Sequence, residues 1–160
     1  MIRSARVPSI LSRITTDKVI QTAILVTTDG ELLGSTSSTF VSPVDGSKES
    51  IENIGTLLAD IAIDYQRLGD DYSQLETNVS MGGGVPPPKK PSHLQCLLLE
   101  FDQGLIGVSA CAGVDYLVMG IAAPDAPMGM IKTRLQLMAE HVQEALAPLT
   151  ATEQQAAIYR

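Results

Sequence analysis

The clearest pattern of apolar and polar positions lies in residues 47–68. Apolar residues recur there at steps of three and four, which is the spacing of one helical face. The stripe consists of Ile51, Ile54, Leu57, Leu58, Ile61, Ala62, Tyr65 and Leu68. Ser47 can cap the start of this helix, and Gly69 suits the left-handed residue that follows a helix end. The pattern therefore predicts a long amphipathic helix from Ser47 to Leu68.

Two pairs of apolar segments predict two β-hairpins. Residues 19–27 are apolar and β-branched, and Asp29-Gly30 is a strong turn between them and a return strand that begins at Leu32. Residues 94–101 meet residues 105–111 across a second short turn. A fifth segment, residues 115–123, is apolar almost throughout, which is typical of a central strand that is covered on both faces.

Two further helices are expected, one over residues 8–14 and one over residues 128–146. Pro148 ends the last helix, and residues 150–160 are expected to form a flexible tail. The order is helix, two strands, helix, three strands, helix. A sheet with two apolar faces needs two covering layers, so the long helix covers one face and the outer helices cover the other. The fold class is therefore α/β, of the α+β kind, with one domain over residues 1–149.

The segment from about 73 to 92 interrupts this order with the string "MGGGVPPPKKP". A phosphate-binding P-loop needs glycines that lead directly into G-K-[ST] and a helix, whereas three prolines separate these glycines from Lys89 and Lys90. The prolines also remove backbone donors. The segment is therefore interpreted as a surface insertion, and its proline run as plain linker or as a ligand for a proline-binding domain.

Composition argues against several functions. The net charge of −7 disfavours nucleic acid and anionic membranes as direct partners. Gly107-Val108-Ser109-Ala110-Cys111 lacks the last glycine of a hydrolase elbow, and strand rather than helix follows the serine. His93 and His141 lack metal-ligand spacing. We therefore expect no enzyme activity, no metal and no cofactor.

Three smaller features leave alternatives open. Asp60 and Asp64 lie one turn apart on a face that is either solvated or turned towards a basic partner surface. A two-residue turn at Gln103-Gly104 would place Cys96 opposite Cys111, and we expect free thiols in a reducing compartment. The arginine- and serine-rich N-terminus has the composition of a transit peptide, but a first helix of the domain is preferred.

Several strings together resemble the roadblock family of dynein-light-chain-like proteins. They are "MIRSARVPSILSR", "QTAILVTTDGELL", "DYQRLG", "LLLEFDQGLIGVS" and "PMGMIKTRLQLMAEHVQEALAPL". The resemblance is closest to the roadblock subunits of the late endosomal and lysosomal adaptor Ragulator, and it covers most of residues 1–149. It departs from the family at the 73–92 insertion. Because it begins at the first residues, it favours a folded N-terminal helix over a cleaved leader.

The resemblance implies a roadblock (profilin-like) fold, with a five-stranded antiparallel sheet between helices. It also implies a non-catalytic adaptor that forms a heterodimer with a second roadblock protein. The wider complex would contain other Ragulator-like subunits and recruit Rag-type GTPases, MTOR and MAPK signalling components. The protein would be cytoplasmic and peripheral on the late endosome, lysosome or vacuole, with membrane contact through a lipidated partner. Alternatives are a roadblock-type dynein light chain, a small-GTPase regulator, or a small-molecule sensor of PAS or GAF type.

The expected partner interface combines the edge strand at residues 94–101 with the apolar stripe of the long helix. A bare, leucine-rich edge strand would aggregate, and a second subunit that pairs with it removes that problem. The alternative is that both features are ordinary core. The expected interface residues are Leu58, Ile61, Tyr65, Leu68, Leu97 and Leu99.

Overall fold

The structure is a computed structural model that describes residues 6–16, 18–41, 46–79, 94–111 and 114–158. Three helices and seven strands form within these ranges. The helices are α1 (Val7–Thr15), α2 (Ile51–Val79) and α3 (Met128–Ile158). The strands are β1 (Ile20–Thr27), β2 (Leu32–Ser35), β3 (Thr39–Val41), β4 (Lys48–Ser50), β5 (Cys96–Phe101), β6 (Gly104–Ala110) and β7 (Tyr116–Ala122).

Five of the strands form one sheet in the order β2-β1-β7-β6-β5, and every neighbouring pair is antiparallel. The expected five-stranded antiparallel sheet is therefore confirmed. β7 lies at its centre, as its apolar composition predicted, and both predicted hairpins pair as neighbours. β3 and β4 form a small separate hairpin that the sequence did not indicate.

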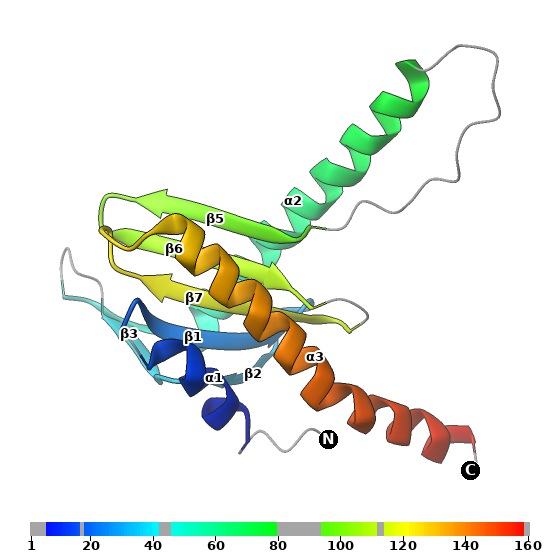
Figure 1. Cartoon of the computed structure of the whole chain (residues 1–160), viewed down its shortest axis with the longest axis horizontal. Coiled ribbons are helices and arrows are strands. Elements are labelled where there is room, and N and C mark those ends of the chain that lie inside the picture. The colour runs from blue at the N-terminus through cyan, green and yellow to red at the C-terminus, as the bar shows by residue number, and fades with distance from the viewer. Residues whose placement is uncertain (1–5, 17, 42–45, 80–93, 112–113, 159–160) are drawn as a thin grey trace.

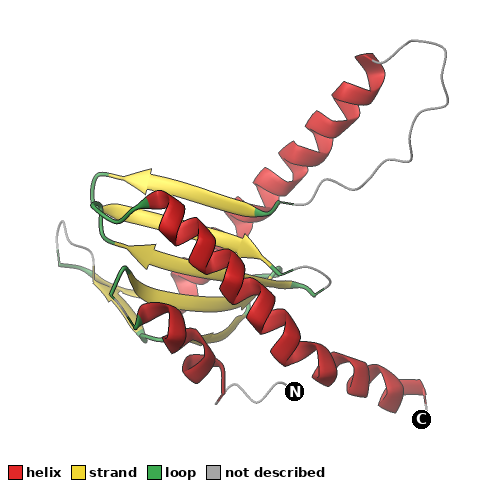
Figure 2. Ribbon diagram, in the orientation of Figure 1, coloured by secondary structure: helices red, strands yellow, loops and turns green. Residues whose placement is uncertain are grey.

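Helices cover the two faces of the sheet as expected, with α2 on one side and α1 and α3 on the other (Figures 1 and 2). Side chains of β1 alternate between the two layers. Ala23 and Leu25 pack in the core cluster beneath α1 and α3, whereas Ile24 and Val26 pack in the cluster beneath α2. The two cores are thus separated by the sheet, and each depends on a different helical layer.

Close packing of α3 against the sheet depends on Gly107 in β6. A Cβ atom at this position would overlap Leu135 of α3 and lie 3.3 Å from Ile131 Cγ2. Ile131, Leu135, Met138 and Val142 are all buried, so the predicted α3 stripe is the stripe that faces the sheet. Glycine at this point lets the helix backbone approach the central strands.

Both long helices have different limits from those predicted. α2 begins at Ile51 rather than Ser47, because Lys48–Ser50 form strand β4. It then passes through Gly69 and ends at Val79 (Figure 1). A glycine inside a helix costs only about 1 kcal/mol. The apolar spacing also continues beyond it at Tyr72 and Leu75.

The last helix likewise continues through Pro148 to Ile158, so the helix end expected at Pro148 is wrong. Residues 150–158, which were expected to form a flexible tail, are helical. Alanine, glutamate and glutamine dominate residues 151–157, and their high helix propensity favours continuation beyond the proline. The string "MGGGVPPPKKP" and the residue His93 both lie outside the described residues.

The register of the second hairpin differs from the predicted one. Phe101 pairs with Gly104, so the two-residue turn is Asp102-Gln103 rather than Gln103-Gly104. Cys96 therefore lies opposite Ser109 and not opposite Cys111. The predicted register differs from the observed register by two residues. Such a shift leaves each side chain on its correct face of the sheet but changes its cross-strand neighbour.

Candidate partner interface

The apolar stripe of α2 changes its environment along the helix. Ile51 and Leu58 are buried against the sheet, and Ile54 and Ile61 are half-buried beside them. Beyond Ala62, which is buried, the same stripe becomes exposed, with 45% of Tyr65, 61% of Leu68, 62% of Tyr72 and 63% of Leu75 accessible to solvent. Figure 1 shows why: the second half of α2 extends past β5 and away from the sheet.

The expectation that Leu58 contacts a partner is corrected by its burial. Only 4% of this residue is exposed, and it packs in the core between α2 and the sheet. A helical stripe does not by itself distinguish the turns that have a sheet beneath them from the turns that do not. Leu58 is therefore a core residue, while Tyr65 and Leu68 from the same stripe lie at the surface.

Strand β5 is one of the two edges of the five-stranded sheet, as expected. It pairs through six consecutive residues with β6 alone. Alternate N–H and C=O groups on its outer side are left without a strand partner within the described part of the chain. The other edge, β2, has four residues, and its pairing with β1 includes a register shift. The long, regular edge at β5 is thus the better template for strand addition.

Leu97 and Leu99 of β5 are half-buried and pack in the core cluster on the α2 side of the sheet. Leu98 points to the opposite side and packs in the cluster of α1 and α3. The two surfaces are physically joined, because the backbone N–H of Leu94 donates a hydrogen bond to Oε1 of Gln66 on α2. The exposed stripe of α2 and the edge of β5 therefore form one continuous candidate interface.

Tyr72 and Leu75 continue the exposed apolar stripe beyond the interface residues predicted from sequence. Their spacing from Leu68 is four and seven residues, so the helical periodicity contains them. A helix that ends before Gly69 leaves both residues outside the predicted stripe. The continuing apolar period was the observation that could have identified them.

The catalytic possibilities considered for the strands do not match the geometry. Ser109 lies within β6, is 1% exposed, and donates its hydroxyl to the backbone oxygen of Gln95 at 3.1 Å. A nucleophile needs an exposed hydroxyl at a strand-to-helix turn.

Nε2 of His141 on α3 lies 3.3 Å from Nη1 of Arg13 on α1, and this contact connects the two helices. Within the described ranges, no three His, Cys, Asp or Glu side chains gather as a metal site.

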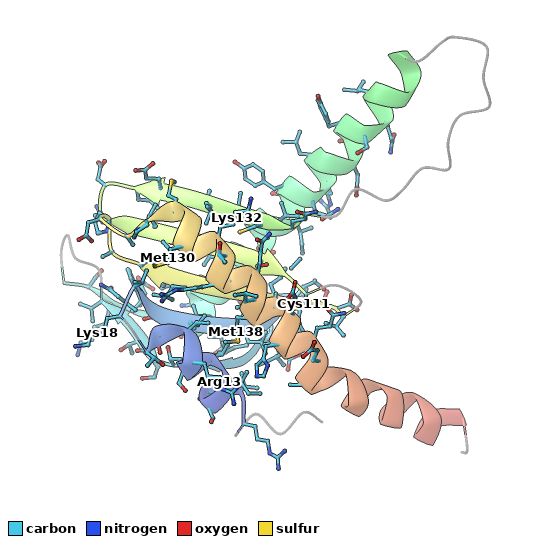
Figure 3. All side chains as sticks on the ribbon, in the orientation of Figure 1. Arg13, Lys18, Cys111, Met130, Lys132 and Met138 are labelled. Atoms are coloured by element: carbon cyan, nitrogen blue, oxygen red, sulfur yellow. The ribbon has the colours of Figure 1, made fainter. Side chains whose placement is uncertain are left out.

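Both cysteines are free thiols in protected positions. Burial raises the pKa of the Cys111 thiol to about 12. Burial also raises the pKa of Cys96, and the nearby Lys132 opposes part of that increase. Cys111 lies at the end of the sheet beside α3, in the cluster that contains Met138 (Figure 3). Since the thiolate is the reactive form, neither environment activates a cysteine.

A cleft of about 1020 Å³ opens at the end of the sheet where β6 finishes and β7 begins. Side chains from α2, including Gln66 and Asp70, and from α3, including Gln136 and Glu140, line it. A small-molecule sensor needs polar groups that converge on its ligand. Here the hydroxyl of Ser109 and the amide oxygen of Gln66 already bond to the chain's own backbone. The cleft therefore adds little support to the sensor alternative.

Among the helices that the structure describes, none combines the length and apolar character needed to cross a membrane. The candidate interface is apolar on α2 and offers backbone hydrogen-bonding groups on β5.

Comparisons with protein-family profiles and with curated protein sequences find no match. Solved structures do match. MglB from Myxococcus xanthus has a TM-score of 0.63 at 11% identity, and the match covers 93% of each chain. An MglB structure with a tetrameric arrangement has a TM-score of 0.61 at 16% identity, covering 88% of each chain. A Roadblock/LC7 domain from Streptomyces avermitilis has a TM-score of 0.54 at 15% identity, covering 88% of this chain and 98% of that domain.

These similarities show that the chain has the roadblock fold, with its sheet between one long helix on one face and two helices on the other. The fold expected from the sequence resemblance is thereby confirmed.

Proposed function

We propose that this protein is a non-catalytic roadblock-fold subunit that pairs with a second roadblock-fold chain and, as a pair, regulates a small GTPase. The observation that carries the proposal is the continuity of the β5 edge with the exposed stripe of α2. The interface residues are Ile61, Tyr65, Leu68, Leu97 and Leu99, with Leu58 excluded by its burial.

Pairing at β5 would satisfy backbone groups on its outer side and protect an apolar edge from aggregation. A neighbouring helix layer would cover Tyr65 and Leu68. Because 45% of Tyr65 and 61% of Leu68 remain exposed, covering both adds about as much as burying one fully exposed side chain, about 1.5–3 kcal/mol in total. The strand pairing supplies geometric specificity. A solved MglB with this fold has a tetrameric arrangement, which supports assembly as a general property of such chains.

Regulation of a small GTPase is the role that we prefer among those implied by the resemblance to roadblock proteins. It is the broader role, and the fold similarity to MglB supports it better than it supports a lysosomal assignment. The narrower form of the proposal is a counterpart of the second subunit of Ragulator. In that form the pair helps to recruit Rag-type GTPases, MTOR and MAPK components to the late endosome or lysosome, and a lipidated partner provides the membrane contact.

Affinity purification of the tagged chain from its own cells, followed by mass spectrometry, tests the proposal. Recovery of a second roadblock-fold chain together with a small GTPase is the expected result. Rag-type GTPases with a lipid-anchored scaffold subunit would establish the narrower lysosomal form, and dynein chains would favour the motor alternative. If no roadblock-fold chain is recovered and light scattering gives a monomer, the proposed pairing is wrong.

A further inference from the structure

The part of α2 that extends past the sheet has the spacing of a coiled-coil seam. Ile61, Tyr65, Leu68, Tyr72 and Leu75 follow one another at alternating steps of four and three residues. This is the a and d pattern by which helices pair. Within α2 the first turns of the pattern pack on the sheet, whereas Leu68, Tyr72 and Leu75 are more than 60% exposed. We call these three residues the distal seam.

The distal seam is long enough to receive another helix. From Leu68 to Val79 the axis of α2 rises about 17 Å, at 1.5 Å for each residue. Figure 1 shows this part of α2 standing clear of the five-stranded sheet and of α1 and α3. Two large aromatic or aliphatic side chains, Tyr72 and Leu75, thus extend the apolar surface beyond the reach of β5. Clustered exposed apolar side chains of this kind mark interaction sites.

Acidic residues border the distal seam. Asp64 and Asp71 immediately precede Tyr65 and Tyr72, which places them at the flanking g positions of the heptad. Arg67 is the one basic residue between Ile51 and Val79, and it lies on the outer surface, where it pairs with Asp64 at 3.8 Å. The g border of the seam therefore presents negative charge to whatever binds it.

This charge pattern opposes the antiparallel pairing of two copies of α2. In an antiparallel pair g meets g, so Asp64 and Asp71 would face aspartates of the second copy. Like charges at such positions are destabilising. An occupant with basic borders would instead gain from each of these contacts.

We propose that the distal seam binds an amphipathic helix of a partner protein whose own apolar a and d residues are bordered by lysine or arginine. This site lies next to the roadblock pairing, which uses the β5 edge and the turns of α2 nearest to it, and the two sites meet at Leu68. It gives the chain a second docking surface, selective for basic helices, on a segment of α2 that the sheet does not support.

A pair of designed peptides provides the test. Each peptide spans about three heptads with leucine at a and d. One carries lysine at e and g and the other carries glutamate. Like charges within each peptide discourage it from pairing with itself. Binding of labelled peptide to the full chain is followed by fluorescence anisotropy, with a scrambled lysine peptide of the same composition as a control for non-specific attraction to an acidic protein. The lysine peptide with the intact heptad pattern is expected to bind at least about tenfold more tightly than the glutamate peptide or the scrambled lysine peptide.

Variants locate the binding. The double change Tyr72→Ala and Leu75→Ala is expected to weaken binding of the lysine peptide at least about tenfold. Leu57→Ala is the matched control, because Leu57 is 60% exposed on the same helix but lies off the seam. The double change Asp64→Lys and Asp71→Lys is expected to reverse the preference towards the glutamate peptide. Circular dichroism checks that each variant keeps its helical content.

The proposal would be overturned if the lysine and glutamate heptad peptides bound equally well. It would also be overturned if the Tyr72/Leu75 variant bound the lysine peptide with unchanged affinity. The same variant is expected to co-purify with its roadblock-fold partner as the unchanged chain does. Loss of that partner together with the peptide would assign the distal seam to the subunit interface, and the separate site would then be wrong. Loss of the partner alone would contradict the proposal in the same way.

Discussion

Leu58 and Leu68 on α2 allow the proposed division between core and interface to be tested with one chemical change. Both are leucines of the same apolar stripe, but Leu58 is 4% exposed and Leu68 is 61% exposed. Leu58→Ala removes buried methyl groups from the α2 core and should lower the free energy of unfolding by about 2–5 kcal/mol. Leu68→Ala removes a surface side chain and should change that free energy by no more than about 0.5 kcal/mol.

The effects on association should be reversed. The minority of interface side chains that cost more than about 1 kcal/mol of binding when truncated cluster near the centre of the interface, and a loss of about 1.4 kcal/mol weakens binding about tenfold. Leu68→Ala should therefore reduce recovery of the roadblock-fold partner. Leu58→Ala should lower the free energy of unfolding. It should reduce recovery of the roadblock-fold partner only to the extent that part of the chain is unfolded. Urea denaturation at several dilute protein concentrations measures stability, because association would otherwise add to it.

Two results would refute this reasoning. Equal destabilisation by the two alanine variants would mean that Leu68 packs within the chain and that the exposed stripe is ordinary core. Unchanged partner recovery by a fully folded Leu68→Ala variant would mean that the stripe near β5 is not part of the interface. Circular dichroism of each variant before the association measurement keeps the two explanations distinct.

Four further measurements test other features of the structure. Gly107→Ala should lower the free energy of unfolding by about 1–3 kcal/mol in urea denaturation, because the new methyl overlaps Leu135, whereas Gly129→Ala, with nothing within 4 Å, should not destabilise. Because burial raises the pKa of the Cys111 thiol, its contribution to stability is complete below the ordinary pKa of 9.0, and the free energy of unfolding should fall as pH rises from there towards 12. A Cys111→Ala variant whose free energy of unfolding fell equally steeply with pH would contradict this. Intact mass with and without reductant, on protein from a cytosolic extract, should be identical, and a two-dalton difference would reveal a disulfide that the Cys96–Ser109 register disfavours. A metabolite panel should leave the melting temperature unchanged, and a ligand-dependent shift that maps to the cleft lined by Gln66 and Glu140 would reopen the sensor alternative.

The strand order could be predicted because each strand has a distinct local pattern. The near-continuous apolar run at residues 115–123 identified the central strand, and Asp29-Gly30 identified the first hairpin turn. The limits of the helices were harder to predict, since Gly69 and Pro148 are typical of helix ends yet lie inside α2 and α3. A glycine costs about 1 kcal/mol and a proline about 3 kcal/mol inside a helix, and helix-favouring residues follow each of them. A rule that considers only the glycine or the proline does not include that balance.

The candidate interface was only partly predictable for a different reason. Periodicity indicates which residues share a helical face, but it does not indicate how far the underlying sheet extends. Leu58 and Leu68 are equivalent in the sequence pattern, and only the position of β5 separates the covered turns from the uncovered ones. The pattern of apolar faces could not determine the hairpin register either, because a shift by two residues keeps Leu97 and Leu99 on the same face of the sheet.

One apolar stripe on α2 therefore has three consequences that follow from its position along the helix. Where the sheet lies beneath it, at Ile51 and Leu58, it stabilises the fold. Where it passes the edge strand, at Tyr65 and Leu68, it becomes available to a subunit that pairs with β5. Beyond the edge, at Tyr72 and Leu75, strand pairing no longer contributes and the acidic g border controls which helix can bind. Substitutions along the stripe should accordingly change from effects on stability, to effects on subunit pairing, to effects on binding of a basic helix, in the order of the chain.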